Sequence, residues 1–248
     1  MAIVYSVLNG VLIGPSIRRR VDVTVMGREN LPATGAFILA MGSHTTEVES
    51  LVVAATLRER QLHFYAKSDY WSRPGLKGRV QRRFMDAVGN IPMERGEGRA
   101  ALKAIEAGVE VLRRGEALAV YPEGTRVSDG KVHAAYPGTV RTLLDAIQAG
   151  LDETGTVPRI PIVPLGLVGM GSVSAPQGGF IPLRGEVEIR IGEPMYLGSM
   201  EVRTLKNGGR PGTAAITQEM SPRVMRRIAR LCEKEYDPKR AKIPPKGF

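Results

Sequence analysis

Apolar and polar residues alternate along the chain with periods that change from segment to segment. The run from Ala36 to Met41 is continuously apolar between Gly35 and Gly42, as in a strand buried on both faces. A polar turn follows, and Leu51 to Leu57 is then an apolar run that favours a helix. Further strands are predicted over residues 21–26, 62–66, 88–93, 117–121 and 186–191, and further helices near residues 102–112, 139–148 and 222–236.

This alternation predicts an α/β fold, with a mostly parallel central sheet flanked by helices. Residues 159–167 are apolar and β-branched, and their prolines predict a strand at a sheet edge or a bulge. Residues 207–212, rich in glycine, predict a flexible loop. The tail to Phe248 has too little apolar content to predict order.

Residues 1–17 are apolar, with a stripe at helical spacing that we expect Pro15 to end. A helix of about 14 residues reaches roughly 21 Å, which is too short to cross a bilayer. The triplet Arg18 to Arg20 follows, and an apolar helix ending in cations is typical of a membrane interface. An ordinary helix docked on its own domain is the alternative. We therefore predict a membrane-associating segment, 1–20, and a single catalytic domain, 21–248, with a basic C-terminal helix and tail.

The composition narrows the possible partners. The 248 residues carry a net charge of +10, which indicates an anionic partner such as a lipid head group, a phosphorylated substrate or a nucleic acid. Aromatic residues make up only 5%, and basic and aromatic residues are not interleaved, so we expect no nucleic-acid binding. Cys232 is the only cysteine, which excludes an internal disulfide and predicts an inert, packed thiol.

The polar turn after the first buried run holds the candidate chemistry. His44 would lie at the carboxyl end of a buried strand, where open α/β sheets bind ligands. His44 and Glu49 are five residues apart, so they can meet only if His44 lies in the loop and Glu49 in the first helical turn. A carboxylate behind an imidazole fixes its tautomer and lets the other ring nitrogen take a proton.

A plainer interpretation stays open for the same residues. Thr46 and Glu49 fit a capping box, in which Glu49 would serve only the start of the helix. Glu47 is also close enough in sequence to be the partner of His44 instead.

Two other strands end in charged turns, with Arg95 after one and Glu123 and Arg126 after another. In a parallel sheet these ends meet at one edge, where arginine forks match phosphate oxygens. Residues 69–83 are basic and contain the only tryptophan, Trp71. They are either a solvated face or a lip over a membrane or an acidic carrier.

From Val23 to Leu167 the chain resembles the glycerolipid acyltransferase family that includes the lysophosphatidic acid acyltransferases. The resemblance is carried by the lead-in GRENLPATGAFILA and four motifs in order, which are His44-Thr-Thr-Glu-Val-Glu49, Gly89-Asn-Ile-Pro-Met-Glu-Arg95, Tyr121-Pro-Glu-Gly-Thr-Arg126 and Ile160-Pro-Ile-Val-Pro164. Any one motif is weak evidence, whereas four at these spacings are strong evidence.

The resemblance implies that His44 deprotonates an acceptor hydroxyl, which attacks the thioester of acyl-CoA or acyl carrier protein, and that Glu49 orients His44. It implies that the acceptor's glycerol phosphate is held by Arg95, Glu123, Gly124, Thr125 and Arg126. It also implies that the acyl or phosphate site is shaped by Pro161 and Pro164. No metal and no cofactor beyond the acyl donor are implied. The histidines have no zinc-ligand spacing.

The chain departs from the family pattern at four positions. Glu49 replaces the usual Asp, Ser43 the usual Asn, Tyr121 the usual Phe, and Val127 a frequent Ser. The expected function is acyl transfer to 1-acylglycerol-3-phosphate, giving phosphatidic acid, on the cytoplasmic face of a membrane. The alternatives are glycerol-3-phosphate or another lipid acceptor, or a non-catalytic lipid-binding homologue.

Overall fold

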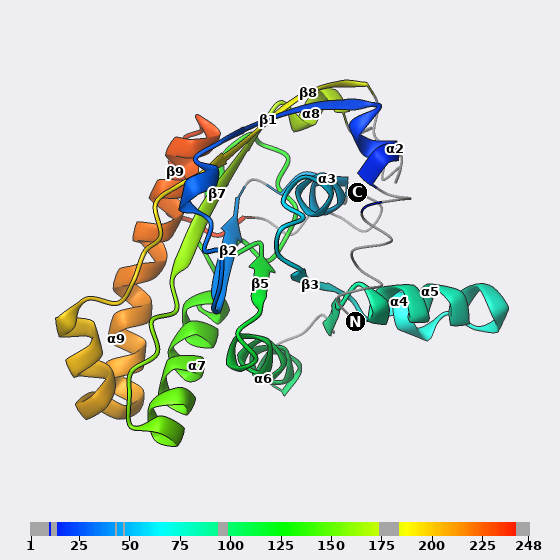
Figure 1. Ribbon diagram of the computed structural model, residues 1–248. Helices are drawn as coiled ribbons and strands as arrows, with labels where there is room; N and C mark the ends of the chain where they lie inside the picture. Colours follow the sequence, from blue (N-terminus) through cyan, green and yellow to red (C-terminus); the bar gives the residue numbers. More distant parts are fainter. Residues whose placement is uncertain are drawn as a thin grey trace.

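Figure 1 shows the computed structural model, which describes residues 10, 14–42, 44–46, 48–93, 99–173 and 184–241. The strands are β1 Val21–Met26, β2 Phe37–Met41, β3 Leu62–Lys67, β4 Ile91–Met93, β5 Ala117–Val120, β6 Val132–His133, β7 Ile162–Val168, β8 Gly185–Ile191 and β9 Tyr236–Asp237. The helices are α2 Gly14–Arg18, η2 Arg28–Asn30, α3 Val48–Thr56, α4 Asp69–Ser72, α5 Gly75–Ala87, α6 Arg99–Arg113, α7 Gly138–Thr154, α8 Met170–Val173 and α9 Ser199–Cys232.

The main sheet has seven strands in the order β1-β8-β7-β2-β5-β3-β4. The five strands from β7 to β4 run parallel to one another, while β8 pairs antiparallel with β7 and parallel with β1. The predicted α/β fold with a mostly parallel sheet is therefore confirmed. Two strands inside the parallel set, β2 and β5, lie side by side, and their carboxyl ends meet at one edge.

The sheet divides the core into two layers (Figure 1). Residues of β2 alternate between them, so that Ile38 and Ala40 pack with α6, α7 and α9, while Phe37, Leu39 and Met41 pack with α2 and α3. All five residues of β2 are buried. Their burial on both faces explains why the segment is apolar at every position rather than at every second one.

Strand β7 corrects one prediction from the sequence. We expected its prolines to place the segment at a sheet edge or at a bulge, and the edge alternative is wrong because β7 lies inside the sheet between β2 and β8. Pro161 precedes the strand, and its carbonyl accepts a bond from Ile38 N at 2.9 Å. Pro164 lies where β8 is ending, and its carbonyl accepts a bond from Gly192 N at 2.9 Å. The missing N–H of proline therefore falls where the antiparallel pairing is interrupted, between the Leu165–Ile191 pair and the Ile162–Met195 bridge.

The predicted loop at residues 207–212 is a second correction, because these residues lie within α9. The helix nevertheless turns sharply there. A Cβ on Gly212 would come within 2.8 Å of the Thr204 carbonyl oxygen, whereas eight residues of straight helix span about 12 Å. The strand predicted from residue 88 begins at Ile91, since Val88 N still bonds Phe84 O, at 3.0 Å, at the end of α5.

Both ends of the chain differ in part from expectation. Pro15 lies in the first turn of α2 rather than ending a helix, a position where proline loses no bond. The rest of the predicted N-terminal stripe, residues 1–9 and 11–13, lies outside the described residues. The tail was expected to lack order, yet β9 pairs with β6, while residues 242–248 are not described. Among the described residues, no helix has both the length and the apolar composition needed to cross a bilayer.

Candidate active site

His44 lies in the turn between β2 and α3, at the carboxyl edge of the sheet. Its backbone carbonyl accepts a hydrogen bond from Val127 N at 2.7 Å, which ties the turn to the loop that follows β5. The His44 side chain is 18% exposed, so the ring is held by protein while part of it remains open. Such a ring can reach a reactant without being free to rotate into solvent.

Glu49 lies in the first turn of α3, and its side chain is only 1% exposed. One carboxylate oxygen, Oε2, lies 2.7 Å from Nδ1 of His44. The other, Oε1, accepts bonds from the Thr45 N–H at 2.9 Å, the Thr45 hydroxyl at 2.6 Å and the Thr46 N–H at 3.3 Å. Glu49 therefore contacts the imidazole as well as the backbone just before the helix, so it does not serve the helix start alone. The reciprocal half of the capping box is not formed, because the Thr46 hydroxyl has no hydrogen-bond partner among the described residues.

The contact assigns the two ring nitrogens of His44 different tasks. A carboxylate accepts hydrogen bonds, so the nitrogen facing it, Nδ1, carries the proton in the neutral ring. Nε2 is then the basic nitrogen. The same carboxylate stabilises the imidazolium after Nε2 takes a proton, which is the arrangement that general-base catalysis requires.

Tyr121, the first residue after β5, packs its ring on that of His44. The ring centroids are 4.0 Å apart, with 25° between the planes. The phenol oxygen lies 3.3 Å from the Ser50 hydroxyl. Burial, and next the charge of Glu49, raise the pKa of Tyr121 well above its usual value, so the phenol stays neutral. Tyr121 thereby fixes the face of the imidazole while Glu49 fixes its edge.

The loop from Tyr121 to Val127 folds back sharply on itself. Gly124 N donates to Tyr121 O at 2.9 Å, and Gly124 has a φ of +66°, which favours glycine. A Cβ at this position would also come within 2.8 Å of the Tyr136 ring. Thr125 and Arg126 are half-buried and lie next in this loop, beside the point where Val127 bonds His44.

Glu123, in contrast, points into the protein. Its residue is 1% exposed, and Oε1 accepts a bond from His133 N of β6 at 2.7 Å. β6 is in turn held by the tail, since Val132 N donates to Glu235 O at 2.9 Å and Ala134 N donates to Lys239 O at 3.1 Å. The carboxylate of Glu123 thus fastens the loop to a small second sheet.

The remaining predicted site residues are placed as follows. Pro161 and Pro164 are both buried next to β2, one just before β7 and one within it. Arg95 and the alternative partner Glu47 lie outside the described residues. The structure thus brings His44, Glu49 and the loop of Gly124 to Arg126 to one edge, with the prolines behind them in the sheet.

Two supporting residues were not predicted from the sequence. In the sequence, Tyr121 differs from the usual Phe, but nothing there predicts that its ring stacks on His44. His133 was also missed, and its ring is held between the Asp129 carboxylate at 2.9 Å and Lys239 O at 3.2 Å. The contacts of Tyr121 with His44 and of His133 with Lys239 join residues far apart in sequence, so no local pattern reveals them.

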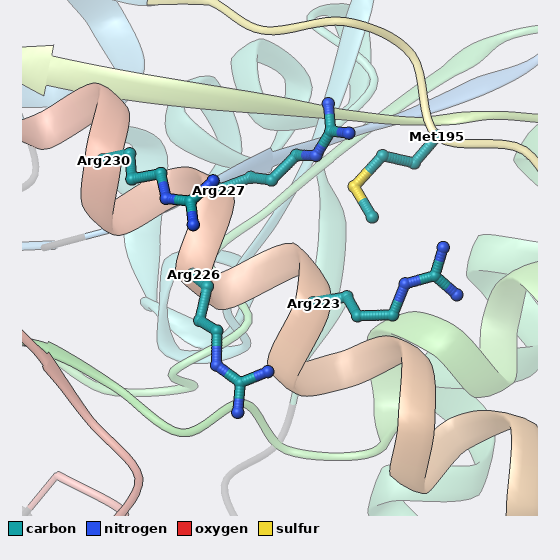
Figure 2. A pocket seen from close by; sticks show the side chains of 5 residues that line it. All are labelled: Met195, Arg223, Arg226, Arg227 and Arg230. Carbon is teal, nitrogen blue, oxygen red and sulfur yellow. The ribbon is translucent and has the colours of Figure 1, made fainter.

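Away from this edge, α9 carries an arginine stripe with a shallow hollow of about 190 Å³ (Figure 2). The hollow is lined by Met195, Arg223, Arg226, Arg227 and Arg230. Carboxylates already occupy part of it, because Arg223 pairs with Glu201 at 2.8 Å and Arg227 with Glu193 at 3.5 Å. No residue of the His44 turn lines it. In the part of the chain that the structure describes, no group of three or more potential ligands could hold a metal ion.

Comparison with known proteins decides the family. The sequence model of the acyltransferase family matches residues 22–168, more than half of the chain, and this range contains the His44 turn and the β5 loop. The chain belongs to the acyltransferase family. The resemblance seen in the four motifs is therefore confirmed.

Relatives of this acyltransferase carry consistent names. It is 23% identical over 177 residues to 1-acyl-sn-glycerol-3-phosphate acyltransferase of Bacillus subtilis, covering 71% of the chain and 75% of that protein. It is 22% identical to the chloroplastic enzyme BAT2 of Brassica napus, covering 69% of the chain but only 44% of the plant protein. The crystal structure of PlsC, the 1-acyl-sn-glycerophosphate acyltransferase of Thermotoga maritima, shares the fold. It has a TM-score of 0.55 and 21% identity, over 87% of this chain and 77% of that one.

Proposed function

We propose that this O-acyltransferase moves a fatty acyl group from acyl-CoA or acyl carrier protein to the free hydroxyl of 1-acylglycerol-3-phosphate, giving phosphatidic acid. The observation that carries the proposal is the 2.7 Å contact between His44 Nδ1 and Glu49 Oε2 at the carboxyl edge of the sheet. A base of this kind can take the proton of an alcohol, and the family transfers acyl groups.

The proposed reaction needs no covalent enzyme intermediate. Nε2 of His44 takes the proton of the acceptor hydroxyl as its oxygen attacks the thioester carbonyl. The new C–O bond forms, the C–S bond breaks, and the imidazolium returns the proton to the departing thiolate. Glu49 keeps Nδ1 protonated throughout and offsets the positive charge that develops on the ring.

The phosphate of the acceptor is assigned to the loop after β5 together with Arg95. Arg126 and Arg95 supply guanidinium forks, which bind phosphate oxygens in pairs, while Gly124 and Thr125 give the loop its turn and a hydroxyl donor. Glu123 acts through its bond to His133 N, by holding the loop in place. Pro161 and Pro164 act from behind, by shaping the strand next to β2.

Two alternatives for the acceptor are glycerol-3-phosphate and another glycolipid or lysophospholipid. The names of the relatives from Bacillus and Brassica favour 1-acylglycerol-3-phosphate, since both are called 1-acyl-sn-glycerol-3-phosphate acyltransferases. The non-catalytic alternative is not favoured, because the dyad that a base needs is assembled and partly open.

The proposed place of action is the cytoplasmic face of a membrane, with the protein attached peripherally through residues 1–20. The net charge of +10 and the exposed Arg18, Arg19 and Arg20 support an anionic lipid surface. Deleting residues 1–20 is expected to reduce co-sedimentation with anionic vesicles. Unchanged co-sedimentation would remove that role from the segment.

The reaction is tested by thiol release and product analysis. Purified enzyme is given acyl-CoA or acyl carrier protein as donor and a panel of acceptors, and products are resolved by the position acylated. We expect phosphatidic acid from 1-acylglycerol-3-phosphate at a kcat/KM well above that for glycerol-3-phosphate. The reverse order would reassign the acceptor, and no transfer to any acceptor would contradict the proposal.

A further inference from the structure

Helices α4 and α5 form a short hairpin, the α4–α5 arm (residues 69–87), which projects from the body of the molecule (Figure 1). Its two helices are fastened to each other. Trp71 Nε1 donates to Asp86 Oδ1 at 2.6 Å, and Arg82 donates to the Trp71 carbonyl from Nη2 at 2.6 Å. A Cβ on Gly78 would overlap the carbonyl of Arg73, which follows α4, so the connection between the helices packs on α5 as closely as glycine allows. The arm is therefore preformed.

Two large apolar side chains of the arm are exposed to solvent. Leu76 is 70% exposed and Val80 is 61% exposed. Leu76 and Val80 are four residues apart on α5, which is about one helical turn, so they lie on the same face. Gly78 and Met85 are the buried residues of the helix. The face of α5 with Gly78 and Met85 is therefore packed within the protein, and the face with Leu76 and Val80 points to solvent.

Cations flank this exposed pair. Lys77, Arg79 and Arg83 are exposed and form no ion pair with any residue that the structure describes. This differs from the arginine stripe of α9, where Arg223 and Arg227 are paired with glutamates. An exposed apolar stripe with unpaired cations on both sides is typical of a helix that lies in the surface of an anionic bilayer.

The arm begins at the edge of the sheet that carries the active site. β3 runs parallel to β5, and the chain leaves its carboxyl end directly into α4. Ser68 N donates to Met93 O at 3.1 Å, which fixes that junction to the end of β4. The arm and the His44 turn therefore start from the same edge. A surface contacted by the arm lies on the side from which a lipid acceptor would reach His44.

We propose that the exposed face of α5, made by Leu76, Val80 and the flanking cations, is a second membrane contact that inserts into an anionic lipid surface beside the active site. This proposal rests on the proposed attachment of the protein to a membrane, and it adds α5 as a contact besides residues 1–20. An acidic protein is the other partner that the cations would fit. The lipid surface is favoured because the centre of the patch is apolar.

The test measures binding of the full chain to vesicles of phosphatidylcholine, with and without phosphatidylglycerol. The variant Leu76→Ser/Val80→Ser is expected to bind anionic vesicles at least about tenfold more weakly. The matched control is Met200→Ser at the start of α9, since Met200 is 71% exposed and Leu76 is 70% exposed. We expect Leu76→Ser alone to weaken binding and Met200→Ser to leave it unchanged. Equal effects of these two single variants would overturn the proposal.

A second pair of variants tests the charges. The triple change of Lys77, Arg79 and Arg83 to Gln is expected to weaken binding to anionic vesicles by roughly fivefold for each charge and to leave binding to neutral vesicles unchanged. The control removes the same charge from Arg223, Arg227 and Arg230 of α9. A loss as large in the control would show that net charge alone matters, which overturns the proposal.

Further readouts separate this proposal from the proposed function. Thiol release with a detergent-dispersed acceptor is expected to be the same for Leu76→Ser/Val80→Ser and the wild type, so a binding defect is not a catalytic defect. If the wild type binds vesicles and the arm variants bind equally well, the arm is not a membrane contact, while the reaction stands. If the arm variants lose binding to acyl carrier protein instead of vesicles, the arm binds a protein and the lipid proposal is wrong.

Discussion

The turn after β2 and the α4–α5 arm start from the same edge of the sheet and are built in opposite ways. In the turn, a carboxylate that is 1% exposed has a partner for each of its oxygens. In the arm, an apolar side chain on the outer face is 70% exposed and has cations beside it. Folding normally buries the apolar group and exposes the charged one. Each region reverses this rule, and each reversal indicates a different kind of partner.

The two reversals also differ in what the fold gains from them. The carboxylate of Glu49 satisfies the amide groups of Thr45 and Thr46 just before α3, so it contributes to stability as well as contacting His44. Leu76 and Val80 contribute little to the fold, because their surface stays in water. Substitutions in the turn should therefore alter stability and turnover together, whereas substitutions in the arm should alter only binding. Four predictions test this contrast, from the largest effect to the smallest.

The largest effect is expected for His44→Ala. Removing the general base should lower kcat/KM by about 10²–10⁴-fold, to the limit of detection. The His44 side chain is only 18% exposed and partners the buried Glu49, so the melting temperature should also fall, while the variant still folds. The measurement is thiol release from acyl-CoA, with thermal melting and vesicle binding as controls. Turnover near the wild-type level in a folded variant would end the catalytic assignment.

The next largest effect is expected for Glu49→Gln. The amide oxygen of Gln can still accept the bonds from Thr45 and Thr46. The uncharged amide nitrogen would then face His44 Nδ1. The imidazolium would lose its counter-charge, so kcat should fall at least about tenfold. Glu47→Gln is the matched control, with the same chemical change two residues away. If Glu47→Gln impaired turnover more than Glu49→Gln, the partner of His44 would have to be reassigned.

A smaller effect is expected at Tyr121, which positions His44 by stacking. Tyr121→Leu should lower kcat by about tenfold, a difference of about 1.4 kcal/mol in the barrier, with little change in KM. Tyr121→Phe keeps the ring and should restore most of the activity. The kcat and KM of both variants are measured side by side. Equal loss in the two variants would assign the contribution to the phenol rather than to the stacked ring.

The smallest effect is expected in a comparison of stability. Glu49→Ala should reduce the free energy of unfolding by about 1–3 kcal/mol, because buried donors lose their acceptor. Leu76→Ser/Val80→Ser should change it by no more than about 0.5 kcal/mol for each substitution, as is usual at exposed sites. Urea unfolding measures both. A large loss in the arm variant would mean that Leu76 and Val80 support the fold, and the contrast between the two regions would fail.

Much of the site could be predicted because its chemistry is local. The apolar run before Gly42 marks β2, and the five-residue spacing between His44 and Glu49 allows contact only across a helix start. The capping and partner roles could not be separated from the sequence, since one carboxylate performs both with different oxygens. Tyr121 could not be predicted as a stacking partner, because the contact exists only when β2 and β5 are neighbours.

The misjudged elements depended on partners far away in the chain. Pro164 is tolerated inside the sheet because β8 stops beside it, and no pattern near Pro164 reveals where β8 stops. The tail gains order from pairing with β6, about 100 residues earlier in the chain, which its own composition does not indicate. The glycine-rich stretch before Gly212 predicts a loop, but it forms a bend within α9. At this bend Gly212 lies close to Thr204 of the same helix.

The link from Glu123 through β6 to β9 has a practical consequence for anyone handling this protein. A protease that cuts after Cys232, or a truncation at the same point, would remove the strand that holds β6. The loop after β5 would lose the contact of Glu123 with β6, although every motif residue remained in place. Preparations should therefore be checked by intact mass, because a truncated protein would be expected to lose activity in the same way as a variant with a substitution in the active site.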